Sequence, residues 1–167
     1  MSDYEAVVAE IPRLRRYARA MLGDRAAADD LVQDTLERAW SRLSQWRAGS
    51  DMRAWLFGIM HNLRVDQLRR PKLIAQSIDK DDFEVPTRPT QTDELELRDL
   101  DAALGRLPDE QREVLLLVAL EEMSYAEIAA TLGIPLGTVM SRLSRGRERL
   151  RLIMDGQQPA ANLRVVR

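Results

Sequence analysis

One stretch of the sequence decides the fold: residues 124–152 read SYAEIAATLGIPLGTVMSRLSRGRERLRL. Ser124 and Glu127 form a capping-box pattern, in which each side chain can bond the backbone N–H of the other residue, so a helix is predicted to start here. Gly133 supplies the left-handed position that ends this helix, and a second helix is predicted to follow Pro135. Two short helices joined in this way are typical of a helix-turn-helix.

The second helix of this pair has two chemically different faces. Its apolar positions step by 4, 3 and 4 residues and are predicted to face the core; they are Val139, Leu143, Gly146 and Leu150. The opposite face carries hydroxyl and guanidinium groups, on Thr138, Ser141, Arg142, Arg145 and Arg149. Arginine pairs bidentately with guanine or with phosphate, and hydroxyls fit either role, so this face is typical of a recognition helix in the major groove of DNA. The alternative is a solvated arginine face.

Charge is distributed unevenly along the chain. The formal net charge of -2 and the pI near 5.6 argue against a protein that binds nucleic acid through a general basic surface. However, residues 53–70 hold four arginines against one acid, and residues 138–151 hold five arginines against one. Residues 72–101, between them, hold four bases against nine acids, a net charge of about -5. Two basic segments that flank an acidic one favour local contacts with DNA.

Composition excludes most other chemistry. The 167 residues are 45% apolar, enough for the core of one or two small domains, and no apolar run is long enough to span a membrane. The N-terminus lacks the layout of a signal peptide, so we expect a cytoplasmic protein without membrane insertion. There is no cysteine, and His61 is the only histidine, which removes thiol nucleophiles and thiolate metal sites. We therefore expect no enzyme, no cofactor, no metal site and no small-molecule substrate.

The apolar pattern predicts two all-helical domains. Helical periodicity occurs on both sides of residues 77–92, which are acidic, contain two prolines and follow no apolar period, so this segment is predicted to be a linker. No run alternates with period two, and no strand is predicted. The predicted boundaries are 1–71 for the first domain, 72–94 for the flexible acidic linker, 95–154 for the second domain and 155–167 for a flexible tail.

A helix of the first domain carries an acidic stripe. Asp24 is placed to cap this helix, which is predicted to run from about Arg25 to Leu43. The residues predicted to point inward are Leu31, Val32, Thr35, Leu36, Ala39 and Trp40. The other face presents polar groups at i, i+3, i+4 and i+7, on Asp30, Gln33, Asp34 and Glu37. Such a stripe is either a solvated face or a surface that binds a partner.

The next helix follows a polar turn at residues 47–51 and is predicted to run from Met52 to Arg70. The residues predicted to form its apolar face are Trp55, Leu56, Ile59, Leu63 and Leu68. The residues predicted to remain polar are Arg53, Asn62, Arg69 and Arg70. Trp46, beside the turn, either packs the domain together or takes part in binding.

Several motifs resemble the extracytoplasmic-function (ECF) sigma factors of bacterial RNA polymerase. In the second domain, the segments similar to the family's region four are LPDEQREV (107–114), SYAEIA (124–129), GTV (137–139) and SRL (141–143). In the first domain, the segments similar to region two are DLVQDT (30–35) and RAWLF (53–57), with Asn62 and Asp66. The resemblance covers about residues 5–70 and 95–153. It implies an alternative sigma factor that gives core RNA polymerase its promoter specificity.

The resemblance also implies a role for each surface. The residues expected to bind the clamp helices of the largest polymerase subunit are Asp30, Gln33, Asp34 and Glu37. The residues expected to open the minus-10 element of promoter DNA, where polar groups and an aromatic wall would hold an unstacked base, are Trp46, Ser50, Arg53 and Asn62. The residues expected to read the minus-35 element are Thr138, Ser141, Arg142, Arg145 and Arg149. An anti-sigma factor is the expected regulator, and the linker is expected to pass through the polymerase interior.

Three residues of the recognition helix depart from what relatives commonly carry. Met140 stands where many have a basic residue, and Ser144 stands where some have a bulkier side chain. Gly146 is often alanine in relatives, and glycine lowers helix propensity by about 1 kcal/mol.

Two other functions compete with a sigma factor. A stand-alone helix-turn-helix regulator, binding operator DNA as a dimer, would explain residues 95–153 but would leave the acidic stripe and residues 46–62 without a function. A hydrolase that uses His61 has no accompanying serine or cysteine nucleophile, and a lone histidine on a helix is usually structural.

Overall fold

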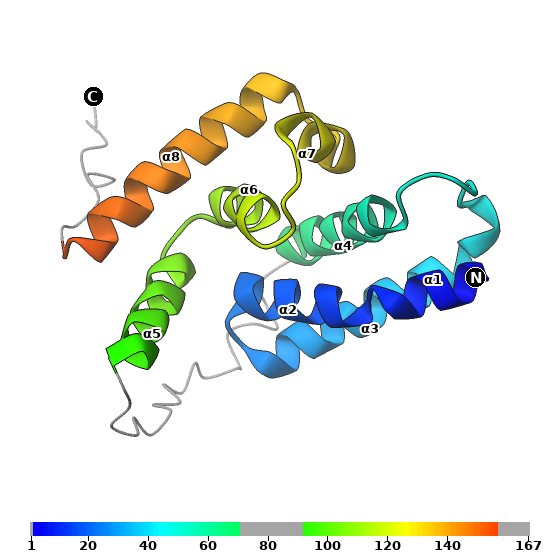
Figure 1. Cartoon of the computed structure of the whole chain (residues 1–167), viewed down its shortest axis with the longest axis horizontal. Helices are drawn as coiled ribbons and strands as arrows, with labels where there is room; N and C mark the ends of the chain where they lie inside the picture. Colours follow the sequence, from blue (N-terminus) through cyan, green and yellow to red (C-terminus); the bar gives the residue numbers. More distant parts are fainter. Residues whose placement is uncertain (1, 71–91, 157–167) are drawn as a thin grey trace.

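A computed structural model describes residues 2–70 and 92–156. Within these ranges the fold is all helical, as predicted, with the elements α1 (Asp3–Ala9), α2 (Ile11–Leu22), α3 (Arg25–Ser41), the 3-10 turn η1 (Leu43–Gln45), α4 (Met52–Arg69), α5 (Thr92–Gly105), α6 (Asp109–Ala119), α7 (Tyr125–Leu132) and α8 (Leu136–Met154). We call α1–α4 the N-terminal half and α5–α8 the C-terminal half (Figure 1). The predicted linker and tail lie outside the described residues, except for 92–94 and 155–156.

The helix starts of the N-terminal half follow the local signals in the sequence. The Asp24 carboxylate accepts a hydrogen bond from the Ala26 N–H at 3.1 Å, which confirms the predicted cap of α3. The Asp51 carboxylate accepts from the Arg53 N–H at 3.0 Å and caps α4 in the same way. These caps fix where the two helices that bear the predicted N-terminal interfaces begin.

The core of the N-terminal half lies between α2, α3 and α4. Thr35 was predicted to point inward and is fully buried, where its hydroxyl donates to the Leu31 carbonyl at 2.7 Å. The Tyr17 ring meets Phe57 edge-on, with the ring centroids 4.9 Å apart. Burial raises the pKa of the Tyr17 phenol well above its ordinary value, so this side chain is neutral within the core.

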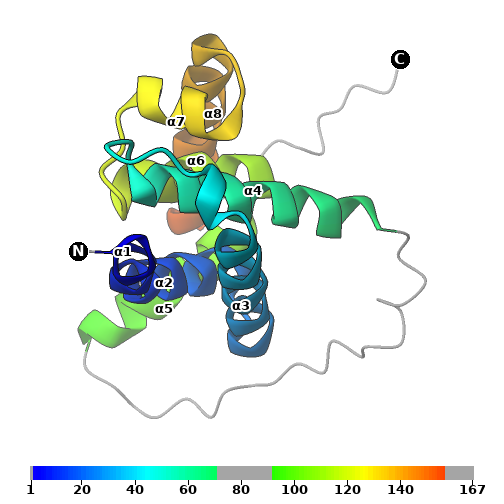
Figure 2. The same cartoon turned by 90° about the vertical axis from the view of Figure 1, so that its right-hand side faces the viewer.

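Two residues predicted to be inward are at the surface. Trp40 is 38% exposed because it lies near the end of α3 and stacks on Tyr4 of α1, with ring centroids 5.6 Å apart, instead of entering the core. Leu68 is 53% exposed because the last turns of α4 extend past the helices on which the helix packs (Figure 2). Both predictions were wrong because the helical period was continued past the part of each helix that packs against other helices.

The helix-turn-helix is present as α7 and α8, but only one of the two hydrogen bonds of the predicted capping box is formed at the start of α7. The Ser124 hydroxyl accepts from the Glu127 N–H at 3.1 Å, and Gly133 ends α7 in the left-handed region at φ 67. The Glu127 carboxylate contacts Arg53 of the N-terminal half at 3.6 Å and makes no described bond back to Ser124. A complete capping box occurs instead at the start of α1, between Ser2 and Glu5.

Close packing of α6 on α8 explains Gly146. A Cβ atom added at this glycine would lie 3.0 Å from Leu115 Cδ1 and 3.3 Å from Gln111 Cβ. Alanine at 146 would therefore push against α6, although it favours a helix by about 1 kcal/mol. The predicted apolar face of α8 is confirmed, since Val139, Leu143 and Gly146 are buried and Leu150 is half-buried.

The two halves pack against each other, which the sequence did not predict. Helix α2 contacts α5 and α6, and α4 contacts α7. Leu117 and Leu132 of the C-terminal half line one small cavity together with Tyr17 and Phe57 of the N-terminal half. Figures 1 and 2 show α6 and α7 lying alongside α2 and α4. In this state, buried residues of both halves form one continuous hydrophobic core.

Candidate nucleic-acid and partner interfaces

The acidic stripe of α3 is an open surface. All four of its residues are exposed: Asp30, Gln33, Asp34 and Glu37. The Gln33 amide donates to the Glu37 carboxylate at 3.5 Å, and among the described residues none of the three acids of the stripe is ion-paired. The neighbouring Asp29, which lies outside the stripe, contacts Arg19 at 3.5 Å. The stripe thus presents carboxylates that are free to meet cations of a partner.

A hollow of about 490 Å³ lies between α4 and the loop before it. Ser50 and Asn62, two of the residues predicted to hold a base, both line this hollow, and Trp55 also lines it. Trp46 does not line it; this side chain is half-buried against the core, and its buried Nε1 has no hydrogen-bond partner among the described residues. The aromatic residue beside the polar groups is therefore Trp55, which the sequence analysis had placed on the apolar face of its helix.

Arg53, predicted to contact DNA, is directed at the C-terminal half in this structure. Its Nη1 donates to the Glu121 carbonyl at 2.6 Å, and its Nη2 lies 3.6 Å from the Glu127 carboxylate. Asp51 is 3.9 Å from the same nitrogen. The guanidinium group is thus held by contacts within the chain and does not face the hollow.

The recognition face of α8 lies beside a second hollow, of about 340 Å³, between α6 and α8. The predicted residues that line it are Thr138, Ser141, Arg142 and Arg145. Glu110 of α6 also lines it, and its carboxylate lies 3.7 Å from Arg142 Nε. Arg149 is not among the lining residues, which separates it from the rest of the predicted face. Sequence periodicity could not find Glu110, because this residue reaches the face from another helix.

The end of α8 is tied into local ion pairs. Arg151 contacts Glu148 at 2.8 Å and Asp155 at 3.2 Å. The hydrogen bond from Arg151 lowers the pKa of the exposed Glu148 carboxyl below its ordinary value. These local pairs reduce the free positive charge at this end of the helix.

His61 has a contact typical of a structural residue. Its Nδ1 lies 2.7 Å from a carboxylate oxygen of Glu113, a buried residue of α6. The pair joins α4 to α6, so the histidine helps to hold the two halves together. None of the helices in the described ranges has both the length and the apolar character needed to cross a membrane.

Comparisons with known proteins identify the family. Residues 7–61 match the family described as the Sigma2 domain of PhyR, and residues 97–150 match Sigma-70, region 4. The chain is 38% identical over 155 residues to the ECF RNA polymerase sigma factor EcfG of Rhodopseudomonas palustris, covering 91% of this chain and 86% of that protein. The chain belongs to the ECF RNA polymerase sigma factors. A second relative of this sigma factor, SigE of Mycolicibacterium smegmatis, is 37% identical over 88% of this chain and 59% of that protein.

Solved structures give the same result for the fold of this sigma factor. RpoE of Bartonella quintana, in complex with the anti-sigma factor NepR, superposes with a TM-score of 0.75 at 35% identity, over 90% of this chain and 95% of that one. CnrH, in complex with the cytosolic domain of CnrY, superposes with a TM-score of 0.66 at 31% identity, over 91% and 86%. Because both halves match sigma-factor domains in the order expected, the stand-alone regulator is excluded. The resemblance stated from the motifs is confirmed.

Proposed function

We propose that this sigma factor binds core RNA polymerase through the acidic stripe of α3 and reads a promoter with two other surfaces. The observation that carries the proposal is the separation of charge: the carboxylates of α3 are exposed without ion pairs among the described residues, while guanidinium and hydroxyl groups line the hollow of α8. Carboxylates repel the phosphates of DNA, so the stripe suits a basic protein surface, whereas the α8 face suits the major groove.

The minus-10 element is assigned to the hollow between α4 and its preceding loop. An extruded base needs polar groups at its edge and an aromatic or apolar face to stack on. Ser50 and Asn62 supply the polar groups, and Trp55 supplies an aromatic wall in the same hollow. Trp46, which packs against the core, is assigned to supporting the loop rather than to touching the base.

The minus-35 element is assigned to α8. Thr138, Ser141 and Arg142 lie in the first half of the helix, where side chains reach base edges most easily, and Arg145 follows one turn later. Arg149 lies farther along the helix and outside the hollow, where contact with the phosphate backbone is expected.

An anti-sigma factor is the proposed regulator. Support comes from two relatives that were solved bound to such proteins: Bartonella RpoE with NepR, and CnrH with the cytosolic domain of CnrY. We also place this sigma factor in the cytoplasm, and we assign it no catalysis of its own. The test is run-off transcription with and without NepR of Bartonella quintana or the CnrY cytosolic domain. Inhibition of transcription by either protein supports this mode of control, and transcription that neither protein reduces contradicts it.

Run-off transcription tests the main proposal. Core enzyme is combined with this protein and a library of promoter fragments, and the expected result is a set of promoter-specific transcripts that core enzyme alone does not make. The free chain should bind duplex promoter weakly, because a protein with net charge -2 neutralises few phosphates at once. No new transcript from the mixture would contradict the function, and so would tight dimeric binding of the free chain to an operator.

A further inference from the structure

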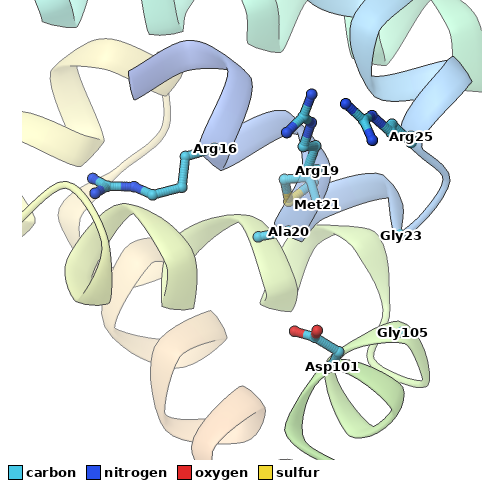
Figure 3. A pocket seen from close by; sticks show the side chains of 8 residues that line it. All are labelled: Arg16, Arg19, Ala20, Met21, Gly23, Arg25, Asp101 and Gly105. Atoms are coloured by element: carbon cyan, nitrogen blue, oxygen red, sulfur yellow. The ribbon is translucent and has the colours of Figure 1, made fainter. Parts of the chain in front are cut away.

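Met140 is an exposed apolar side chain on the helix assigned to the minus-35 element. Most methionines of the described residues fill the core instead, at 2% to 8% exposure: Met21, Met52, Met60 and Met123. Figure 3 shows Met21 among the side chains of α2 beside a hollow of about 410 Å³. Met154 is exposed but ends α8, whereas Met140 is 51% exposed in the first half of that helix. Met140 therefore lies where side chains reach base edges most easily.

The packing of α8 places Met140 on its outermost strip. Val139 and Leu143 are buried and define the inward side of the helix. Thr138 and Arg142, which face α6, are half-buried. The fully exposed residues of this part of α8 are Leu136, Gly137, Met140, Ser141, Ser144 and Arg145. The surface that α8 presents to a groove is thus turned toward Met140, compared with the face predicted from the sequence.

Small neighbours leave the Met140 side chain free on its own side of the helix. Gly137 lies one turn before it, and a Cβ atom added at this glycine would meet nothing within 4 Å. Ser144 lies one turn after it. Across from these residues, Tyr125 at the start of α7 lines a hollow of about 530 Å³ together with Met140 and Ser144. The thioether therefore borders an open space that has a second, aromatic wall.

The charges around this hollow suit DNA. Arg147 lines it, is exposed, and forms no ion pair among the described residues. Arg145, exposed on the neighbouring side of the helix, adds a second guanidinium group. Cations beside an apolar side chain match a groove in which phosphates surround the base edges. This arrangement favours nucleic acid over an apolar protein segment as the occupant.

The chemistry of methionine limits which base it can recognise. In the major groove, guanine, adenine and cytosine present hydrogen-bonding groups, whereas thymine also presents an apolar C5-methyl group. A thioether has no hydrogen to donate and is a weak acceptor, so it cannot satisfy the polar edges. Its unbranched, adaptable chain does suit contact with a methyl group. The base-edge group that fits Met140 is therefore the methyl group of thymine.

We propose that Met140 reads a thymine of the minus-35 element through contact with its C5-methyl group. Tyr125 forms the other wall of the apolar space, and Arg147 contacts the adjoining phosphate. This inference rests on the proposed function, because it adds a base-specific contact to the helix assigned to this element. The two sides of α8 then recognise different chemistry: polar base edges on the α6 side, and a methyl group on the α7 side.

Replacement of single thymines by uracil tests this contact. Uracil pairs as thymine does and keeps the O4 acceptor, so the methyl group alone is lost. Run-off transcription first identifies a promoter that core enzyme uses when this protein is added. Holoenzyme binding is then measured with each thymine of the minus-35 element, on either strand, replaced in turn. We expect one position at which uracil weakens binding roughly fourfold, the effect of one buried methyl group.

Met140→Ala shows whether that methyl group meets Met140. This variant should bind the thymine promoter roughly fourfold less tightly, and the thymine-to-uracil ratio of affinities at the same position should fall to about one. Met140→Leu keeps an apolar side chain of similar size and should keep most of the ratio. Met154→Ala is the matched control, because it removes an exposed methionine at the other end of α8 and should leave the ratio unchanged.

Met140→Lys introduces the kind of residue that many relatives carry here. Lysine can donate to O6 and N7 of guanine, so the preference at the identified base should move from thymine toward guanine. Its charge should also steepen the salt dependence of binding by about one unit. Circular dichroism should show unchanged helix content in every variant, since the substituted side chain is exposed.

Three results would overturn the proposal. The first is that no thymine of the minus-35 element shows a uracil effect, and the second is that the effect persists in Met140→Ala. The third is a loss of affinity for core enzyme in Met140→Ala without DNA, which would make Met140 and Tyr125 a protein-binding patch. Specific transcription without a uracil effect that depends on Met140 would overturn this inference alone, whereas the absence of any promoter-specific transcript would overturn the proposed function as well.

Discussion

The acidic stripe of α3 and the hollow of α4 lie on adjacent helices of the same half, yet they differ in access. All four stripe residues are exposed, and none of the acids is ion-paired among the described residues. The hollow is partly lined by α7, and Arg53 beside it is bonded to Glu121. A partner can therefore meet the stripe without any change in the packing of the two halves, whereas access to the hollow depends on α7.

The largest expected effect is on the open surface. Asp34→Arg places a cation where the stripe is proposed to meet basic clamp helices, and such a like-charge contact costs about 3 kcal/mol, or roughly a hundredfold in affinity for core enzyme. Binding of fluorescently labelled protein to core enzyme measures this. Asp99→Arg, an equal change at an exposed residue of α5, is the control. An equal loss in both variants would mean that net charge, and not the stripe, governs binding.

The next effect concerns the covered surface. Asn62→Ala removes polar groups from the hollow without touching α3, so core binding should be unchanged while strand opening falls roughly tenfold, the cost of about one lost hydrogen bond to an unstacked base. Permanganate reactivity of unpaired thymines reports the opening. A template with a pre-melted, mismatched minus-10 region should restore transcription. If the mismatched template gives this variant no advantage over a duplex one, the hollow does not act in opening.

Substitution of Arg145 and of Arg149 of α8 should affect DNA binding in different ways. Arg145 lines the hollow of α8, and losing a bidentate contact to guanine costs about 1 to 3 kcal/mol at one base, so Arg145→Ala should change the minus-35 preference. Arg149→Ala should weaken all sequences alike and lower the salt slope by about one unit. Holoenzyme binding to single-base minus-35 variants at several salt concentrations separates these outcomes. If Arg145→Ala weakened all sequences alike and Arg149→Ala changed the base preference, the two assignments would be exchanged.

The smallest expected effect is a pH dependence of stability. The pKa of the Glu121 carboxyl is raised by burial in the folded protein and should return to its ordinary value on unfolding. The folded protein therefore binds a proton more readily, so the contribution of Glu121 to stability is present at low pH and is lost as the pH rises from the ordinary glutamate range through the raised pKa. Denaturant unfolding measured across this range checks the direction. Glu121→Gln should remove this part of the pH dependence and leave any part that arises from other groups.

Local signals in the sequence predicted local structure well. Asp24, Ser124 and Gly133 mark helix ends because each bond they make spans only a few residues, and the structure confirms all three. The α3 stripe and the apolar face of α8 follow from the helical period for the same reason. The family motifs then assigned functions to these faces, which periodicity alone left open between solvent and a partner.

These local signals could not predict contacts between residues that are far apart in the sequence. Arg16 and Glu121 are 105 residues apart in the chain, and nothing local to either residue indicates the other. The same limit explains Glu127, which contacts Arg53 instead of completing its capping box, and Trp55, which lines the hollow rather than lying wholly in the core. Each of these side chains is placed by the packing of the two halves, and that packing depends on the whole fold.

Gly146 has a consequence for how this sequence can change over generations. Alanine there gains helix propensity but meets Leu115 at 3.0 Å, while a smaller residue at 115 alone would leave a cavity under α8. The sign of the alanine change therefore depends on whether the Leu115 side chain can move by a few tenths of an ångström. The residues at positions 115 and 146 are thus expected to be coupled among descendants of this chain.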